Sequence, residues 1–379
     1  MKTFLTIITL WVSYSVQITP DGKIEISAIA KDNGKRAQIS TFEKAVSLKM
    51  ISKSENGRYK NVQIFSLSIR IKILDSEMLI KQRLPVDIVI CADISGSMSG
   101  RKMALLRESI MFIVKNLEPY DRLGIVTFQS RSVIRSHLIP MNNEGKKTIE
   151  KIVYNLNAMG GTNIKKGMEL AYKMVKERKS KNNIASILLL SDGNDHPNVP
   201  VKEYTVLAKN FDKQMKNSRE SYIVHSFGIT NQHNEKKLAI LAKASGGNFY
   251  YINDMNDLSK AFADSVGLLL SAIGRSAYIV ISLEKNFEFV EKFGNAWVDA
   301  DPNFVQKITK EISSNTSNPS KIGLIRLQYV NTGMDRTFVA KVKMNKNDGS
   351  NSGRFLIASG MVIFLNNDIF VKVRSEAYY

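Results

Sequence analysis

The sequence has little of the chemistry that builds disulfide, thiolate or imidazole sites. Of its 379 residues one is a cysteine, Cys91, and four are histidines. A single cysteine excludes an intrachain disulfide framework, a zinc ribbon, a RING module and a CxxC redox site. The histidines form no HExxH pair, which argues against a His-rich zinc site.

Long apolar runs are also missing, because no stretch reaches the roughly 18 apolar residues of a membrane-spanning helix. At the N-terminus, Lys2 precedes a short apolar segment, Phe4–Val12, and then a polar one, Ser13–Gln17. This order is typical of a short signal peptide, and a first β-strand explains it equally well. We therefore expect a cytoplasmic protein, or a secreted one if residues 1–17 are a signal peptide.

Charge of one sign is in excess. Lys and Arg number 54 against 35 Asp and Glu, which gives a net charge of +19. Such a surface attracts nucleic acid, anionic lipid or an acidic protein. The densest basic run, Lys165–Lys181, has helical apolar spacing, which favours the solvated face of a helix. Because no basic–aromatic stripe is present, nucleic-acid binding is not favoured, and a nucleic-acid or anionic-membrane binder stays an alternative.

The chain divides into β-rich and α/β segments. Residues 18–85 alternate apolar and polar residues, which predicts strands at 24–29, 45–51, 62–69 and 71–73, with turns at 32–34 and 55–57. Period-2 patterns return in residues 274–379, with loops expected at 315–319 and 345–352. Between these segments, Val86–Ala92 is a nearly continuous apolar run, as expected of a strand buried on both faces.

Helix-period and strand-like segments then alternate through residues 86–273. The predicted helices are 102–117, 144–156, 163–179, 201–217, 235–244 and 257–273, and the predicted strands are 122–128, 132–139, 184–190, 222–227 and 248–252. This alternation predicts a doubly wound, Rossmann-like α/β domain with a mostly parallel sheet. Because the ends of such a domain often lie close together, we expect it to be inserted in one β-sandwich formed by 18–85 and 274–379.

Polar residues gather where the first buried strand ends. Asp93, Ser95 and Ser97 place one carboxylate and two hydroxyls in a single tight turn. Ligands of open α/β sheets bind outside the carboxyl ends of the strands. Hard oxygens of this kind suit Mg²⁺, Mn²⁺ or Ca²⁺.

Two further loops strengthen this interpretation. Thr162 follows Gly160-Gly161 and precedes a predicted helix, so it is either the N-cap of that helix or a ligand just outside it. Asp192 follows another buried strand and precedes Gly193. Together, three chain-distant loops bring two carboxylates and three hydroxyls to one sheet edge, and they predict a divalent-cation site.

These residues resemble the von Willebrand factor A domain (VWFA) with its metal-ion-dependent adhesion site (MIDAS). The match covers about 86–273 and includes all five positions: Asp93, Ser95, Ser97, Thr162 and Asp192. The resemblance implies that the hydroxyls bind the ion directly, that the acids bind it directly or through water, and that a carboxylate of a protein partner completes the octahedron.

Adjacent sequence is similar to the intracellular A-domain proteins of plants and protists. The similarity lies in Lys102–Leu106, Asp121–Phe128, Gly160–Ile164, Ser186–Gly193 and Ala244–Phe249. Some plant members carry a RING ubiquitin-ligase module, but this chain lacks the cysteines for one. Related inter-alpha-inhibitor heavy chains are secreted, so the resemblance leaves the compartment open.

Enzyme motifs find little support in the same loops. Asp93-Ile-Ser95 lacks the second acid of a phosphatase D-x-D pair, and no G-x-x-x-x-G-K-[ST] phosphate loop is present. Ser99-Gly-Arg-Lys102 fits S-x-x-K, but neither S-D-N nor K-T-G follows. Asp195 and His196 follow the third loop and either line the ligand face or form a solvated turn. Cys91 lies inside the buried strand, which favours a core residue over a reactive thiol.

The sequence thus predicts a metal-dependent adhesion or scaffold protein that docks an acidic residue of a protein partner, and not an enzyme. A Mg²⁺-dependent enzyme of unknown type, built on a similar site, is the alternative. The partner, the physiological metal and the oligomeric state are not specified by the sequence.

Overall fold

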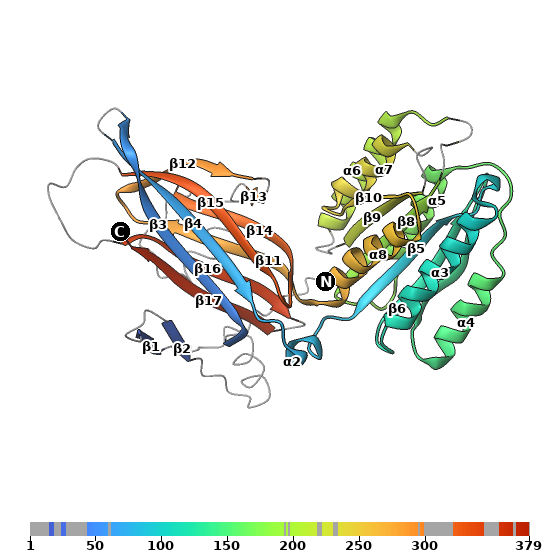
Figure 1. Ribbon diagram of the computed structural model, residues 1–379, viewed down its shortest axis with the longest axis horizontal. Coiled ribbons are helices and arrows are strands. Elements are labelled where there is room, and N and C mark those ends of the chain that lie inside the picture. The colour runs from blue at the N-terminus through green and yellow to red at the C-terminus, as the bar shows by residue number, and fades with distance from the viewer. Residues whose placement is uncertain are drawn as a thin grey trace, which may run out of the picture. The chain divides into compact units, whose positions relative to one another are not determined.

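The computed structural model separates the chain into two units (Figure 1). Unit 1 comprises Met1–Gln82 with Ile273–Tyr379, and unit 2 comprises Arg83–Ala272. The structure describes residues 15–18, 24–27, 44–59, 62–192, 195, 198–217, 222–229, 234–294, 296–298, 321–344, 356–366 and 369–378. The turns expected at 32–34, 315–319 and 345–352 lie outside the described residues.

Unit 2 is built on a six-stranded sheet with the order β10-β9-β8-β5-β6-β7. Neighbouring strands are parallel except for β7, which runs antiparallel to β6 at one edge. The predicted α/β fold with a mostly parallel sheet is therefore confirmed. The strands are β5 (Val86–Asp93), β6 (Arg122–Phe128), β7 (Ser132–Pro140), β8 (Ile184–Ser191), β9 (Tyr222–Ile229) and β10 (Phe249–Ile252).

Helices cover both faces of this sheet (Figure 1). One face packs its buried side chains against α5, α6 and α7, where Tyr172 and Phe211 stack with ring centroids 3.8 Å apart. On the other face Phe227 of β9 stacks on Phe262 of α8 at 4.5 Å. The helices of unit 2 are α3 (Arg101–Asn116), α4 (Asn143–Tyr154), α5 (Ile164–Lys176), α6 (Val201–Asn217), α7 (Glu235–Ala244) and α8 (Met255–Leu270), and a 3-10 turn, η1, spans Gly96–Met98.

The central strands β5 and β8 are buried along their whole lengths. They are parallel neighbours with Ala92 opposite Leu190, so both end at the same edge of the sheet. Asp93 closes β5, and Asp192 directly follows β8. This shared register brings two loops that are distant in the chain to one place.

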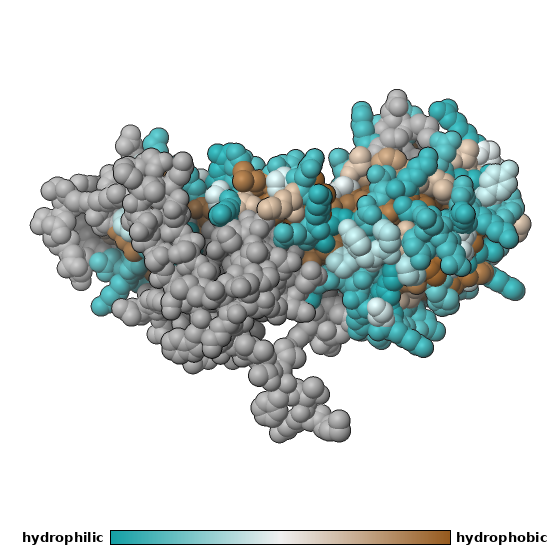
Figure 2. All heavy atoms as spheres, turned by 90° about the horizontal axis from the view of Figure 1, so that it is seen from below, coloured by the Kyte–Doolittle hydropathy of each residue, from teal (hydrophilic) through white to brown (hydrophobic). Residues whose placement is uncertain are grey.

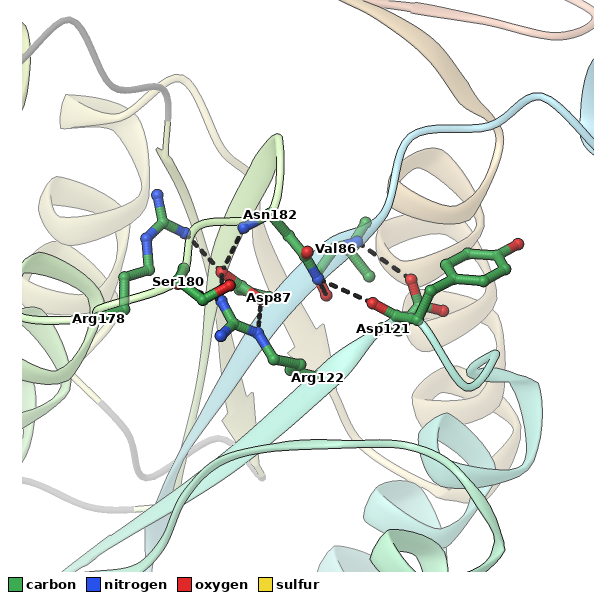
Figure 3. Close-up of polar contacts among 8 residues, drawn as sticks. Val86, Asp87, Asp121, Arg122, Arg178, Ser180 and Asn182 are labelled. Atoms are coloured by element: carbon green, nitrogen blue, oxygen red, sulfur yellow. Dashed lines mark hydrogen bonds and ion pairs between the residues drawn. The ribbon is translucent and has the colours of Figure 1, made fainter. Parts of the chain in front are cut away.

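The opposite end of these strands, where β5 and β6 begin, holds a buried ionic cluster (Figure 3). Asp87 accepts hydrogen bonds from Arg122 Nε at 2.7 Å and from a second guanidinium nitrogen at 2.6 Å. Arg178 and the backbone N–H of Asn182 also donate to Asp87, at 3.0 and 3.1 Å. Asp87 lies six residues before the end of β5, or about 20 Å away along an extended strand, so this cluster is separate from the loops that follow β5 and β8.

Unit 1 contains a four-stranded sheet, β12-β15-β4-β3, and a five-stranded sheet, β13-β14-β11-β16-β17. Strand β4, from the first β-rich segment, pairs with β15 from the last one at ten register positions. Side chains from both sheets, among them Phe65, Ile279 and Val362, form one buried core. The strands are β3 (Val46–Tyr59), β4 (Val62–Ile73), β11 (Ala272–Leu283), β12 (Phe287–Phe293), β13 (Trp297–Val298), β14 (Ile322–Asn331), β15 (Asp335–Met344), β16 (Leu356–Asn366) and β17 (Ile369–Tyr378), and a separate hairpin pairs β1 (Ser15–Ile18) with β2 (Ile24–Ser27).

Several local predictions for the strands were wrong. The segment 55–57 is not a turn but part of β3, at a register shift between Ser54 and Arg58. The two strands expected at 62–69 and 71–73 are the single strand β4. A short helix that the sequence did not predict, α2 (Glu77–Ile80), is capped by Ser76, whose hydroxyl accepts the N–H of Leu79. The helix expected to reach residue 273 ends at Leu270, and β11 begins at Ala272.

The described surface in Figure 2 is mostly hydrophilic, with apolar residues in small groups between polar ones. The basic run Lys165–Lys181 lies mainly on α5, which buries Met168, Ala171 and Val175 and exposes Lys166, Lys173 and Lys176. The run is therefore the solvated face of an amphipathic helix. No helix in the described part of the chain is long and apolar enough to cross a membrane.

Candidate metal centre

Asp93 is the last residue of β5 and is fully buried. One carboxylate oxygen accepts the backbone N–H of Ser95 at 2.9 Å, and the other accepts the hydroxyl of Ser191 at 2.6 Å. Ser191 ends the neighbouring strand β8. The two strand ends are thus tied together through one carboxylate.

The two serines of the first loop present their hydroxyls to each other and to the third loop. Ser95 and Ser97 Oγ atoms lie 3.1 Å apart, on either side of the first residue of η1. Ser97 Oγ donates to Asp192 Oδ1 at 2.9 Å. Because Ser95 makes no side-chain cap to η1, its hydroxyl is not committed to holding the local backbone.

Asp192 lies just beyond β8, and its side chain is fully buried. Its second oxygen, Oδ2, contacts the ammonium of Lys102 in the first turn of α3. Asp192 therefore meets a hydroxyl and a cation, both of which come from the segment that follows β5.

Thr162 is buried on a loop held against the first one. The N–H of Met159 donates to the carbonyl of Ile94 at 2.8 Å, and the N–H of Gly96 donates to the carbonyl of Gly160 at 2.9 Å. The N-cap of α5 is Asn163, whose side chain accepts the N–H of Lys166 at 2.9 Å. Of the two roles considered for Thr162, the N-cap is therefore excluded.

The backbone at Gly160 adopts a conformation that residues with a side chain rarely adopt. Its φ is +74°, and a β-carbon built there would lie 1.9 Å from Oε1 of Gln129. A left-handed backbone favours glycine, and any larger residue would also have to displace the Gln129 side chain. The sequence signal Gly160-Gly161 thus marks the turn that carries Thr162 to the first loop.

Asp195 does not line a ligand face as a spare base. It is buried, and its Oδ1 accepts the backbone N–H of Ile164 at 2.8 Å. Its Oδ2 accepts from Lys237 Nζ at 3.0 Å and from the hydroxyl of Tyr204. The alternative of a solvated turn is also wrong for Asp195, while His196 lies outside the described residues.

Burial raises the pKa of Asp93 to about 6, and the nearby charge of Asp192 acts in the same direction. The hydrogen bonds from Ser191 and Ser95 oppose this rise without cancelling it. The ionised form of Asp93 is therefore under-stabilised where no cation is bound. A divalent ion placed here would reverse that balance, because opposite charge favours the ionised carboxylate.

This raised pKa predicts a pH dependence that Asp93→Asn removes. An acid with a raised pKa in the folded state stabilises the fold below its unfolded pKa, and the contribution is lost as pH rises through about 6. Buried His225, whose pKa is lowered to about 4, acts oppositely, since its contribution is lost as pH falls.

The comparison that isolates Asp93 is therefore wild type against Asp93→Asn in chelator. We expect the two proteins to be closest in stability near pH 4. The variant should become the more stable one by pH 7, by about 1.4 kcal/mol for each pH unit that separates the folded-state pKa from the ordinary one. Denaturant unfolding at several pH values measures this difference, and a constant difference from pH 4 to 7 contradicts it.

The donor set fits a hard divalent cation. All five side chains offer oxygen, the class of ligand that Mg²⁺, Mn²⁺ and Ca²⁺ prefer. A cation, the ammonium of Lys102, already lies against one of the two carboxylates. Within the described residues no cluster of three or more His, Cys, Asp and Glu could hold a metal, so any site here depends on the hydroxyls.

Two contacts at this edge were not anticipated from the sequence. Ser191 has a signal, since it directly precedes Asp192 at a strand end, but sequence alone does not say which way its hydroxyl points. The sequence marks Lys102 as the lysine of an S-x-x-K match and the start of a predicted helix, whereas the structure places its ammonium on Asp192. Cys91 is fully buried and its pKa is raised by that burial, as expected of a core residue.

Comparisons with known proteins place the domain in a family. The model of the von Willebrand factor type A domain matches residues 87–264. The uncharacterized protein YfbK of Escherichia coli (strain K12) is 29% identical over 278 residues, which cover 68% of this chain and 47% of that protein. The E3 ubiquitin-protein ligase WAV3 of Arabidopsis thaliana is 31% identical over 115 residues, which cover 30% of this chain and 15% of that protein.

The chain thus spans about half or less of the length of these relatives. Among solved structures, a von Willebrand factor type A protein from Catenulispora acidiphila has a TM-score of 0.58 at 15% identity, covering 88% of this chain and 74% of that one. At that identity the likeness concerns the fold. Sequence family and fold agree that residues 87–264 of this chain are a von Willebrand factor type A domain.

Proposed function

We propose that the protein is a divalent-metal-dependent docking module, adhesive or scaffolding in role, and not an enzyme. Asp93, Ser95, Ser97, Thr162 and Asp192 would hold Mg²⁺, or Mn²⁺ or Ca²⁺ in its place, as an intact MIDAS. The observation that carries this is the all-oxygen cluster, with two buried carboxylates, at the carboxyl ends of β5 and β8. The match of residues 87–264 to the von Willebrand factor type A domain, whose resemblance implies docking of a partner carboxylate, supports the same role.

The bound cation would supply an electrophilic position that takes a hard oxygen ligand, and a carboxylate of a protein partner fits it. The residues of this chain do the positioning. Ser191 holds Asp93 from β8, and Ser97 holds Asp192 from the first loop. The narrower resemblance to intracellular plant and protist proteins stays a prediction.

The enzyme alternative needs a general base within hydrogen-bond reach of an attacking water. Asp93 and Asp192 are committed to the proposed ion, and Asp195 is engaged by Lys237, Tyr204 and a backbone N–H. These engagements favour docking over catalysis.

We expect Mg²⁺ and Mn²⁺ binding by calorimetry to fall by at least about 100-fold in Asp93→Ala, because a ligand is lost. Asp264→Ala, an exposed aspartate on α8, is the matched control and should bind as wild type does. Circular dichroism of each variant checks that the fold is intact. Zn²⁺ preferred over Mg²⁺, at a site that Asp93→Ala leaves unchanged, contradicts the proposed site.

Partner docking is tested with affinity capture from the native cell, in Mg²⁺ and in chelator. Proteins that wild type retains only in Mg²⁺, and that Asp192→Ala does not retain, support docking. A panel of phosphate, ester and nucleotide substrates tests the alternative. Turnover by wild type well above background that Asp192→Ala lacks would replace docking with an enzyme.

A further inference from the structure

Lys102 is a cation built into the candidate metal centre. It is the second residue of α3, and the helix begins directly after the loop that carries Ser95 and Ser97. Its ammonium contacts Oδ2 of Asp192, while Ser97 occupies Oδ1. The Lys102 side chain is 25% exposed and that of Asp192 is fully buried, so the pair lies at the boundary between the site and solvent.

The site has two buried carboxylates but one paired ammonium, that of Lys102. Asp93 and Asp192 are both buried, and a buried carboxylate is costly unless it is paired. Of the basic residues that the structure describes, Lys102 is the one that forms an ion pair with either of them. Lys102 therefore supplies part of the positive charge that a metal ion would otherwise bring.

We propose that Lys102 is a resident counter-cation that competes with the divalent metal for Asp192 and tunes the site toward an anionic partner. This inference rests on the proposed metal site. Without metal, the ammonium stabilises Asp192 and the contacts that join the loop after β5 to the loop after β8. When metal binds, the same ammonium is repelled by the ion, which lowers the metal affinity of the isolated protein.

The charge of the loaded site shows why a partner would matter. A divalent ion and Lys102 bring three positive charges against the two negative charges of Asp93 and Asp192. One positive charge is left, and one carboxylate from a partner neutralises it. With a neutral residue at position 102 the ion and the two aspartates balance on their own, and the site loses this preference for an anionic ligand.

The experiment measures Mg²⁺ and Mn²⁺ affinity of the full chain by calorimetry and its thermal unfolding midpoint in chelator. Lys102→Met and Lys102→Gln both remove the charge but differ in polarity, so agreement between them separates charge from packing. Lys115→Met is the control, because this substitution changes the net charge equally. Lys115 is exposed on the last turn of α3, about 20 Å along the helix from Lys102.

We expect Lys102→Met and Lys102→Gln to bind Mg²⁺ about 10-fold or more tightly than wild type, since a like charge close to the ion is removed. Their unfolding midpoint in chelator should be lower than that of wild type, and Mg²⁺ should raise it by more. Lys115→Met should match wild type in both measurements.

Two results overturn the inference, and they are distinguishable. If wild type binds Mg²⁺ and the Lys102 variants bind it equally or more weakly, Lys102 is not a competitor and the metal site stands. If neither wild type nor any variant binds Mg²⁺ or Mn²⁺, the proposed metal site fails and the inference fails with it.

Discussion

Replacing Lys237 with Met is expected to lower the free energy of unfolding of unit 2 by about 3–5 kcal/mol, the cost of breaking a buried ion pair by removing one partner. The Lys237 side chain is 1% exposed and that of Asp195 is fully buried. Met has a similar length but no charge, so it would leave the buried carboxyl of Asp195 without its cation.

The reason for so large an effect is the number of elements that meet at this pair. Lys237 Nζ, on α7, donates to Asp195 at 3.0 Å and to Asn198 Oδ1 at 2.9 Å, and lies 5.3 Å from the ring centre of Tyr204 on α6. Asp195 in turn accepts the N–H of Ile164 at the start of α5. Loss of the ammonium therefore affects three helices and the loop that joins Thr162 to α5.

The control for this prediction is Lys236→Met, which changes the net charge equally. Lys236 is the exposed neighbour of Lys237 on the same helix. It should alter stability by less than about 0.5 kcal/mol, as most surface substitutions do. Since the chain has two units, hydrogen exchange of peptides from β5, β8 and β9 reports on unit 2 alone. Equal exchange in Lys236→Met and Lys237→Met contradicts the assigned role of the pair.

The sequence predicted the fold of unit 2 well because period and burial agree there. The apolar runs that became β5 and β8 are buried on both faces, and the helix-period segments between them bury one face each. Boundaries were less accurate where two patterns meet. Apolar residues continue from α8 into β11, so the predicted helix ran past Leu270. The Asn-Gly pair at 56–57 indicated a turn, but this segment lies inside β3, at a register shift with residues paired to β4 on both sides of it.

That Asp93, Ser95, Ser97 and Asp192 lie close together could be predicted, because β5 and β8 end at the same edge of the sheet. What sequence could not give is how charged side chains pair across the fold. Asp195 had the same local appearance as a solvated turn, and its partners Ile164, Tyr204 and Lys237, which lie up to 42 positions away, explain why it is buried. Lys102 likewise became informative only when its ammonium was seen on Asp192.

Asp87, at the other end of the sheet, is another acid whose partners the sequence alone does not reveal. It lies inside the buried, mostly apolar strand β5. Asp87→Asn is expected to destabilise unit 2 by about 3–5 kcal/mol, because it leaves two poorly exposed guanidinium groups without their counter-charge. The Arg178 and Arg122 side chains are only 4% and 14% exposed, and both donate to Asp87 (Figure 3). The amide of Asn keeps the size of the side chain but offers one acceptor in place of two.

Asp335→Asn is a closely matched control, because Arg70 binds Asp335 in the same two-bond geometry, at 2.8 and 2.6 Å, but on the surface. With 54% and 37% of the two side chains exposed, solvent screens that pair, and its loss should cost far less stability than the loss of the buried Asp87 cluster. Hydrogen exchange of the peptides around β5 and β6 should rise strongly in Asp87→Asn, while exchange around β4 and β15 in Asp335→Asn should change little. If both variants show the same small change, water reaches the Asp87 cluster and the buried pair is not what holds the start of β5, β6 and β8 together.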